Sequence, residues 1–60
     1  MFEQFLGKKC EAHIAGFGSS YGQIYCGILE SYDKDYLLIA SKKSKTLISI
    51  KTLLALTIVD

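Results

Sequence analysis

The segment from Gly27 to Ala40 constrains the fold most, because two apolar runs flank a short polar turn at Asp33-Lys34-Asp35. Gly27 lies inside the first run, where a missing side chain permits a sharp bend or a close approach of another strand. The second run, Tyr36 to Ala40, is almost continuously apolar, and such a run predicts a strand that is buried on both faces. The segment therefore predicts an antiparallel hairpin.

The rest of the chain repeats this pattern of short strands and turns. Lys8 to Gly16 alternates apolar and polar residues, and Ile24 to Tyr32 makes the first arm of the hairpin. Thr46 to Ile50 resumes the alternation after the polar turn of residues 41–45, and Leu53 to Val59 is a last, partly β-branched strand. These segments predict a small all-β fold, a strongly bent five-stranded antiparallel barrel of the Sm-like or SH3-like type.

A short helix is expected ahead of the first strand. Phe2, Phe5 and Leu6 have the i, i+3, i+4 spacing of one helical face, and Gly7 follows where a helix would end. Such a short helix is not stable alone, so its aromatic face is expected to lie across an open end of the barrel. We expect one domain over residues 1–60, with this helix in residues 1–6 and the strands in residues 8–60.

Size and composition favour self-association. A chain of 60 residues makes one domain at most, and such a domain buries only about 60% of its unfolded surface. Half of the residues are apolar, which is more than so small a domain can easily hide, so we expect a homo-oligomer. Lysines interrupt the apolar C-terminal half, so no segment is long enough to cross a bilayer. Met1 to Leu6 carries Glu3 and Gln4 and is too short for the hydrophobic region of a secretory signal. We therefore expect no membrane partner and a cytoplasmic location.

The charge pattern bears on nucleic-acid binding. The net charge is +1, and the seven basic residues are all lysines. Arginine is the residue best suited to bidentate recognition of phosphates and guanine edges, so its absence disfavours tight, sequence-specific binding. Weaker binding through lysines and backbone stays open.

The sequence offers no catalytic or metal-binding group. Cys10 and Cys26 lie on neighbouring predicted strands; a disulfide is one alternative, and two free, buried thiols are the one we expect. One histidine and two distant cysteines do not supply a zinc site, and His13 has no nucleophile or carboxylate dyad beside it. Asp33 and Asp35 are expected to accept hydrogen bonds from turn amides. We expect no metal, no cofactor and no enzymatic activity.

Two segments are candidate contact surfaces. The Gly16 to Gly22 loop carries Phe17 and Tyr21, which would stack on nucleobases, anchor a protein partner, or fold back over the barrel. The Lys42-Lys43-Ser44-Lys45 turn would contact phosphates, an effect that repetition in an oligomer increases. Its alternative role is a solvated turn that discourages edge pairing.

The hairpin carries a recognisable spacing. Gly27 is followed by Leu29, then by Tyr32 and Asp33 ahead of the next strand, and the C-terminal part carries Leu53 and Leu56 spaced by three. With the first four residues as its framework motif, and the two leucines approximating a second signature, the chain resembles the Sm-like family of small barrels, which includes the LSm and Hfq-like proteins. The resemblance spans nearly all of the chain. It implies a hexameric or heptameric ring, built by pairing the last strands of adjacent subunits.

The resemblance is weaker where the family binds RNA. Asp35 and Leu37 stand where the family has a base-stacking residue and an asparagine, and Lys51-Thr52 replaces an arginine-glycine or lysine-histidine pair. The resemblance thus implies RNA binding that is weak or uses an altered surface; the candidate contacts are Lys42, Lys43, Lys45, Lys51 and Tyr21. The alternative is an oligomeric scaffold or protein-interaction module that has lost RNA binding, with Phe17 and Tyr21 as its interaction loop.

Overall fold

The computed structural model describes residues 2–16 and 22–59 and contains five strands and two short 3₁₀ turns. The strands are β1 (Lys9–Ile14), β2 (Gln23–Tyr32), β3 (Tyr36–Ala40), β4 (Lys45–Ser49) and β5 (Leu53–Ile58). The 3₁₀ turns are η1 (Glu3–Phe5) and η2 (Ile50–Thr52). The five expected strands are confirmed, with bounds that differ by one or two residues from those predicted.

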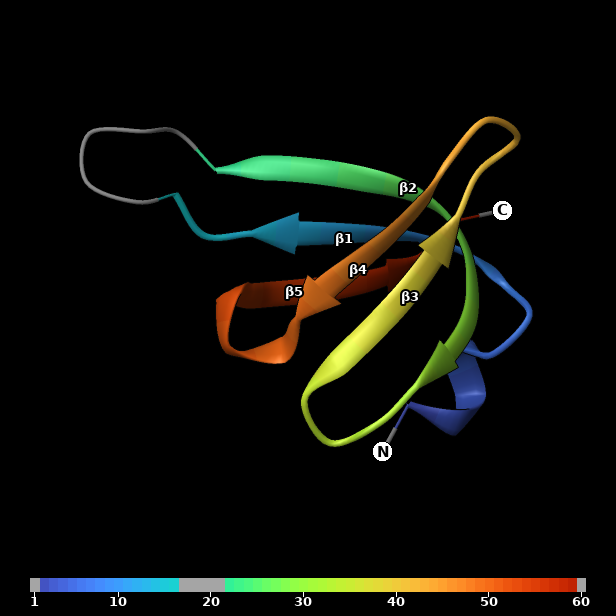
Figure 1. Ribbon diagram of the computed structural model, residues 1–60, viewed down its shortest axis with the longest axis horizontal. Coiled ribbons are helices and arrows are strands. Elements are labelled where there is room, and N and C mark those ends of the chain that lie inside the picture. Colours follow the sequence, from blue (N-terminus) through green and yellow to red (C-terminus); the bar gives the residue numbers. More distant parts are fainter. Residues whose placement is uncertain (1, 17–21, 60) are drawn as a thin grey trace.

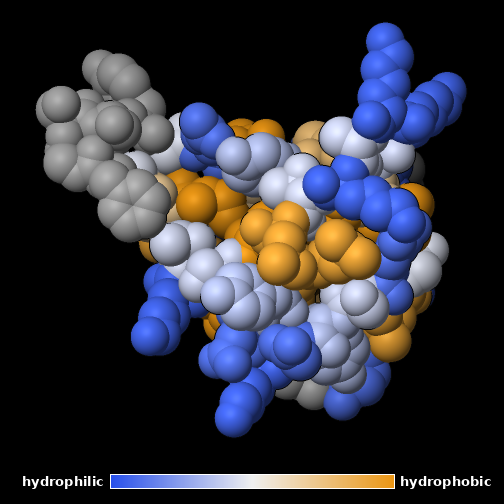
Figure 2. Space-filling model, viewed as in Figure 1, coloured by the Kyte–Doolittle hydropathy of each residue, from blue (hydrophilic) through white to orange (hydrophobic). Residues whose placement is uncertain are grey.

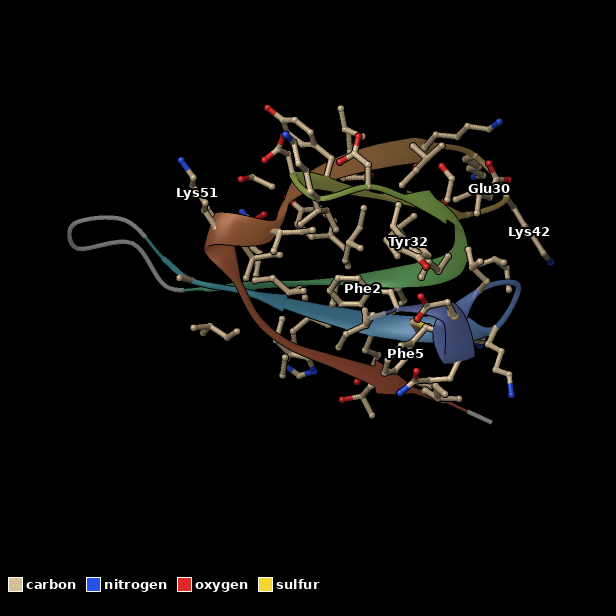
Figure 3. All side chains as sticks on the ribbon, turned by 90° about the horizontal axis from the view of Figure 1, so that it is seen from below. Phe2, Phe5, Glu30, Tyr32, Lys42 and Lys51 are labelled. Atoms are coloured by element: carbon tan, nitrogen blue, oxygen red, sulfur yellow. The ribbon has the colours of Figure 1, made fainter. Side chains whose placement is uncertain are left out.

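The strands form one antiparallel sheet in the order β4-β3-β2-β1-β5. The sheet bends so strongly that the β3–β4 hairpin crosses in front of β1 and β5 (Figure 1), and side chains fill the space between these two parts (Figure 3). Among the described residues no ladder joins β4 to β5, so both strands are open edges. The small all-β fold is confirmed, and closure into a barrel stays a prediction.

At Gly27, the neighbouring strand β3 leaves no room for a side chain on β2. A Cβ atom at this position would lie 2.5 Å from the Ala40 carbonyl oxygen and 2.8 Å from Ile39 Cγ2. The ladder between β2 and β3 also shifts register between Leu29 and Ser31. Figure 1 shows β2 curving along its length. The predicted close backbone approach at Gly27 is confirmed, and it lets one long strand serve both parts of the bent sheet.

The core lies on the inner face of the sheet and consists of small and aliphatic side chains. They alternate along the strands with outward-facing residues, as strand geometry requires. The buried hydrophobic residues of the described chain are Cys10, Ala12, Leu29, Leu37, Ile39 and Ile48. No polar or charged residue of the described chain is buried. A core this small gives a marginally stable domain.

The two cysteines lie on opposite faces of the sheet. Cys10 pairs with Gly27 in the β1–β2 ladder and is fully buried, whereas Cys26, one residue earlier in β2, points outward and is exposed. Both thiols are free. The prediction of a buried thiol is thus confirmed for Cys10 and wrong for Cys26, because the alternation of β2 was not accounted for. Burial raises the pKa of the Cys10 thiol.

β3 is buried on one face only, which corrects the prediction from its apolar run. Leu37 and Ile39 point into the core, whereas Tyr36 is 45% exposed and Leu38 and Ala40 are partly exposed. The outward-facing side chains of β3 are therefore exposed or half-buried. Figure 2 shows apolar side chains gathered over β3 and β4 in the middle of this face, where Leu47 of β4 is 63% exposed.

The N-terminal helix is the single 3₁₀ turn η1, shorter than the α-helix that the spacing indicates. Phe2 and Phe5 pack against the core, and the ring of Phe2 meets that of Tyr32 edge-on at 5.6 Å. Gly7 ends the turn with a φ of 75°, in the left-handed region that glycine adopts readily. Within the described residues, no helix has the length and apolarity needed to cross a lipid bilayer.

Candidate functional site

The turn between β2 and β3 is held by the side chain of Asp33. Its Oδ1 accepts hydrogen bonds from the backbone N–H groups of Asp35 (2.7 Å) and Tyr36 (2.8 Å). The N–H of Asp33 in turn donates to the Tyr36 carbonyl oxygen (2.9 Å). The two bonds to the carboxylate lower the pKa of Asp33. The expected bonding to turn amides is confirmed for Asp33, but the Asp35 carboxylate accepts no hydrogen bond from a described residue.

The connection between β4 and β5 is fastened to this turn. The N–H of Ile50 donates to the Asp35 carbonyl oxygen at 2.9 Å, which joins η2 to the β2–β3 turn. Thr52 Oγ1 donates to the Ser49 carbonyl oxygen at 2.8 Å and holds the chain in its short 3₁₀ conformation. Two segments that are far apart in sequence therefore meet at one end of the sheet.

A cleft of about 270 Å³ opens where these segments meet, and we call it the turn cleft. Lys34 and Lys51 bring positive charge to it from opposite sides of the contact, and Tyr36 contributes an aromatic ring. Its lining residues are Lys34, Asp35, Tyr36, Ser49, Ile50 and Lys51. A second hollow of about 300 Å³ shares Lys34 and Ile50 with the turn cleft and extends to Phe2 and Tyr32.

The chemistry of the turn cleft is mixed. Two ammonium groups attract a phosphate, and an exposed tyrosine offers a face on which a base can stack. The Asp35 carboxylate, which no described residue pairs, repels phosphate, although it can accept hydrogen bonds from an amino group. The cleft therefore suits a nucleotide chain, with weaker attraction than two lysines alone would give.

The structure divides the predicted RNA-contacting lysines into two groups. Lys42, Lys43 and Lys45 lie at or beside the β3–β4 turn, whereas Lys51 lies beyond the other end of β4. Figure 3 shows Lys42 and Lys51 at opposite ends of the molecule. Lys45 also pairs with Glu30, with Nζ 3.4 Å from Oε1. A single short ligand on one copy of the chain cannot contact all four lysines.

The framework residues of the hairpin occupy distinct environments. Gly27 and Leu29 lie inside the sheet, Tyr32 is half-buried against Phe2, and Asp33 holds the turn. Leu37, which stands at the position of the family's asparagine, is fully buried and faces the core.

Two predicted contact residues lie outside the described part of the chain. They are Phe17 and Tyr21, the aromatic residues of the loop between the first two strands.

Sequence reasoning missed Lys34 and Tyr36 as site residues. Lys34 appears in the sequence only as part of a polar turn, and nothing local signals that Lys51 is near it. Tyr36 was missed because the continuous apolar run of β3 predicted a strand that is buried on both faces. The signal that could have found it is the two-residue alternation, since burying Leu37 and Ile39 turns Tyr36 outward.

The described residues contain no cluster of three or more side chains able to hold a metal ion. His13, on the outer face of β1, has its Nε2 3.5 Å from Glu11 Oε1, and both side chains are more than one-third exposed. Comparisons with known proteins give no assignment: no family model matches the chain, and neither the curated proteins nor the solved structures include a significant match.

Proposed function

We propose that this chain is an Sm-like subunit that assembles edge to edge into a hexameric or heptameric ring and binds single-stranded RNA weakly at the turn cleft. The observation that carries the proposal is the pair of unpaired edge strands, β4 and β5, at the two sides of an open sheet. The hairpin with Gly27, Leu29, Tyr32 and Asp33, and the short turn η1 ahead of β1, support the same family.

The edge strands favour assembly for two physical reasons. An open edge presents unpaired backbone N–H and C=O groups, which a strand of another copy can satisfy. The edges are also apolar: Leu47 of β4 is 63% exposed, and Leu54 and Ile58 of β5 are 73% and 39% exposed. Pairing β4 of one copy with β5 of the next is a head-to-tail contact, and such contacts generate a ring when the rotation closes.

Assembly would also strengthen the turn cleft as an RNA site. A ring repeats Lys34 and Lys51 in every subunit, so the local positive potential exceeds what a net charge of +1 suggests. Tyr36 offers the stacking face that Asp35 lacks at the family's usual position. The Asp35 carboxylate opposes phosphate, which is why the proposed binding is weak.

Light scattering on the purified chain at micromolar concentration tests the assembly. A mass of six or seven subunits that persists on dilution is the expected result. A stable monomer would overturn the ring and leave an isolated SH3-like sheet.

Fluorescence anisotropy with short U-rich and A-rich RNAs tests the binding, at about 50 mM salt where lysine–phosphate attraction is strong. The double variant Lys34→Gln/Lys51→Gln should weaken binding several-fold. The matched control Lys42→Gln/Lys43→Gln removes the same charge from the other end of the sheet and should have the smaller effect. Absence of any binding at this salt concentration would refute the RNA proposal and leave the assembly proposal standing.

A second candidate function is an oligomeric scaffold that docks another protein and has lost RNA binding. The unpaired Asp35 carboxylate in the turn cleft favours it, as does the separation of Lys42, Lys43 and Lys45 from Lys51.

Pull-downs with and without nuclease distinguish the scaffold from an RNA-binding ring. A partner that survives nuclease treatment, and is lost when Phe17 or Tyr21 is changed to alanine, would support the scaffold. Retention that depends on intact RNA would support the first proposal.

A further inference from the structure

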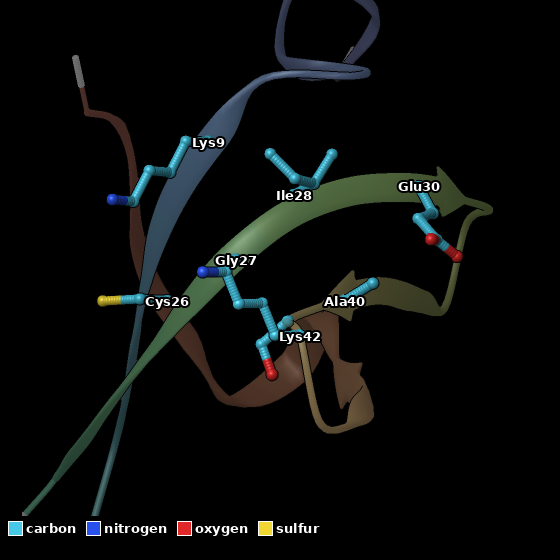
Figure 4. A pocket seen from close by; sticks show the side chains of 8 residues that line it. Lys9, Cys26, Gly27, Ile28, Glu30, Ala40 and Lys42 are labelled. Atoms are coloured by element: carbon cyan, nitrogen blue, oxygen red, sulfur yellow. The ribbon is translucent and has the colours of Figure 1, made fainter.

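The outward face of the sheet carries a hollow that the proposed function does not use. It has a volume of about 630 Å³, within the range of roughly 300–1,000 Å³ typical of small-molecule sites. Three central strands and the β3–β4 turn build it (Figure 4), and we call it the outer hollow. Since neither edge strand lines it, its shape does not depend on edge-to-edge assembly.

The floor of the outer hollow is apolar. Ile28 of β2 pairs with Ala40 of β3, and both line the hollow together with Gly27 beside them. Ile28 is 40% exposed, and no described element covers it. Lys9 of β1 pairs with Ile28 on its other side, which places a lysine in the same row across the sheet.

The charges of the outer hollow are arranged asymmetrically. Figure 4 shows the ammonium groups of Lys9 and Lys42 on one side of the floor, near the thiol of Cys26, and the carboxylate of Glu30 at the far end. Glu30 is compensated by Lys45 at 3.4 Å. Neither Lys9 nor Lys42 forms an ion pair with any residue in the described ranges. One end of an apolar floor thus carries two lysines without an ion pair to a described residue, with the Glu11 carboxylate nearby at 4.0 Å from the Cys26 thiol.

We infer that the outer hollow binds a free aliphatic carboxylate of medium chain length. The carboxylate lies between the Lys9 and Lys42 ammonium groups, and the hydrocarbon chain lies along Ile28 and Ala40. An inorganic anion would leave the apolar floor uncovered, and a cationic amphiphile would meet two like charges. The lysine stems add apolar surface beside the bound chain.

Residue-resolved ¹H–¹⁵N NMR with decanoate, added below its micelle-forming concentration, tests the inference. The amide signals of Gly27, Ile28 and Ala40 should shift saturably. Decyltrimethylammonium has the same tail with the opposite charge, and acetate has the same head without a tail. Neither should reproduce the shifts. Equal shifts with the cationic amphiphile, or no saturable shift with decanoate, would overturn the site.

Variants separate the two halves of the proposed contact. Lys9→Gln/Lys42→Gln should weaken decanoate binding about tenfold, from two lost surface ion pairs. Lys34→Gln/Lys51→Gln removes the same charge at the turn cleft and should leave the affinity unchanged. Ile28→Ser should weaken binding without unfolding the chain, because Ile28 is already 40% exposed. Equal weakening by both lysine pairs would show general charge attraction and refute the site.

Sedimentation with anionic phospholipid vesicles distinguishes the free aliphatic acid, which is the ligand inferred above, from a membrane surface. A chain that sediments with vesicles and shows no shift with decanoate would refute the inference in favour of a membrane surface.

Discussion

At the scale of single residues, Gly27 of β2 lies where the neighbouring strand β3 leaves no room for a side chain. Gly27→Ala would place a Cβ 2.5 Å from the Ala40 carbonyl oxygen, a backbone atom that cannot move without displacing β3. We expect the free energy of unfolding to fall by about 2–3 kcal/mol, as in other overpacked sites. Urea unfolding measures it, as a lower midpoint with an unchanged slope.

Gly7 provides the control for this prediction. A Cβ at Gly7 would meet no atom within 4 Å, and asparagine tolerates its φ of 75° better than other residues do. Gly7→Asn should therefore destabilise the chain less than Gly27→Ala. Equal losses in the two variants would mean that the close approach of β2 and β3 is not what requires glycine at position 27.

Asp33 makes the stability of the β2–β3 turn depend on pH. The N–H groups of Asp35 and Tyr36 lower the pKa of Asp33 in the folded chain. Its contribution to the free energy of unfolding is therefore fully present above the unfolded pKa of about 3.9, and it is lost as the pH falls through the folded pKa. The difference in unfolding free energy between the wild type and Asp33→Asn should be largest at neutral pH and shrink below about pH 4. Urea unfolding at several pH values measures it.

Asp35→Asn is the matched control, because the Asp35 carboxylate accepts no hydrogen bond from a described residue. At neutral pH it should lower the free energy of unfolding less than Asp33→Asn does, because no hydrogen bond from a described residue is lost. A difference for Asp33→Asn that stays constant from neutral to acidic pH would contradict the assignment.

The residue scale also shows where sequence reasoning failed. The roles of Gly27 and Asp33 could be predicted, because a glycine within a strand and an aspartate at a turn each have a local physical cause. The exposure of Cys26 could not be predicted from its apolar neighbours. Its face is set by the register that pairs Cys10 with Gly27, and register is a property of two strands together.

At the scale of elements, η1 is fastened to the sheet by an aromatic contact. The rings of Phe2 and Tyr32 meet edge-on, with centroids 5.6 Å apart and an interplanar angle of 67°. A double-mutant cycle with Phe2→Leu and Tyr32→Leu should give a coupling free energy of about 0.5–1.5 kcal/mol. Pairing Phe2→Leu with Tyr25→Leu is the control, because Tyr25 packs against the core without a ring contact to Phe2. Equal coupling in both cycles would contradict a specific contact.

The strands themselves were predictable, and their relative placement was not. Alternation in residues 9–14 and the turn chemistry of residues 33–35 indicated β1 and the hairpin directly. Lys51 was grouped with Lys42 on charge alone. β4 separates these two lysines, and in the fold Lys51 lines the turn cleft together with Lys34. The proximity of Lys34 and Lys51 results from the bend of the whole sheet, and a local sequence pattern does not predict that bend.

At the scale of the whole molecule, half of the residues are apolar, yet an open sheet of this size buries only six hydrophobic residues of the described chain as its core. Three of the exposed apolar side chains lie on the edge strands: Leu47 on β4, and Leu54 and Ile58 on β5. Edge pairing between copies would cover these side chains and would also pair the backbone N–H and C=O groups of the two edge strands. The stability of the subunit would then depend on its concentration.

Complementary edge variants test this arrangement. In a head-to-tail ring every contact uses one β4 and one β5, so Leu47→Lys or Leu54→Lys alone should disrupt every contact and give monomers by light scattering. Both residues are more than half exposed, so circular dichroism should show an unchanged fold. Mixing the two variants leaves one intact β4 and one intact β5, which should pair into a one-to-one dimer and no further.

This dimer distinguishes the head-to-tail contact from its alternatives. If copies instead met β4 to β4, Leu54→Lys would still dimerise by itself, and if they met β5 to β5, Leu47→Lys would do so. If they associated through the outward apolar face over β3 and β4, Leu54→Lys would keep the wild-type mass, because Leu54 lies on β5. A wild-type mass for Leu54→Lys therefore assigns the contact to β4 or to the face over β3 and β4, and a wild-type mass for Leu47→Lys assigns it to β5. Only the dimer from the mixture supports a ring.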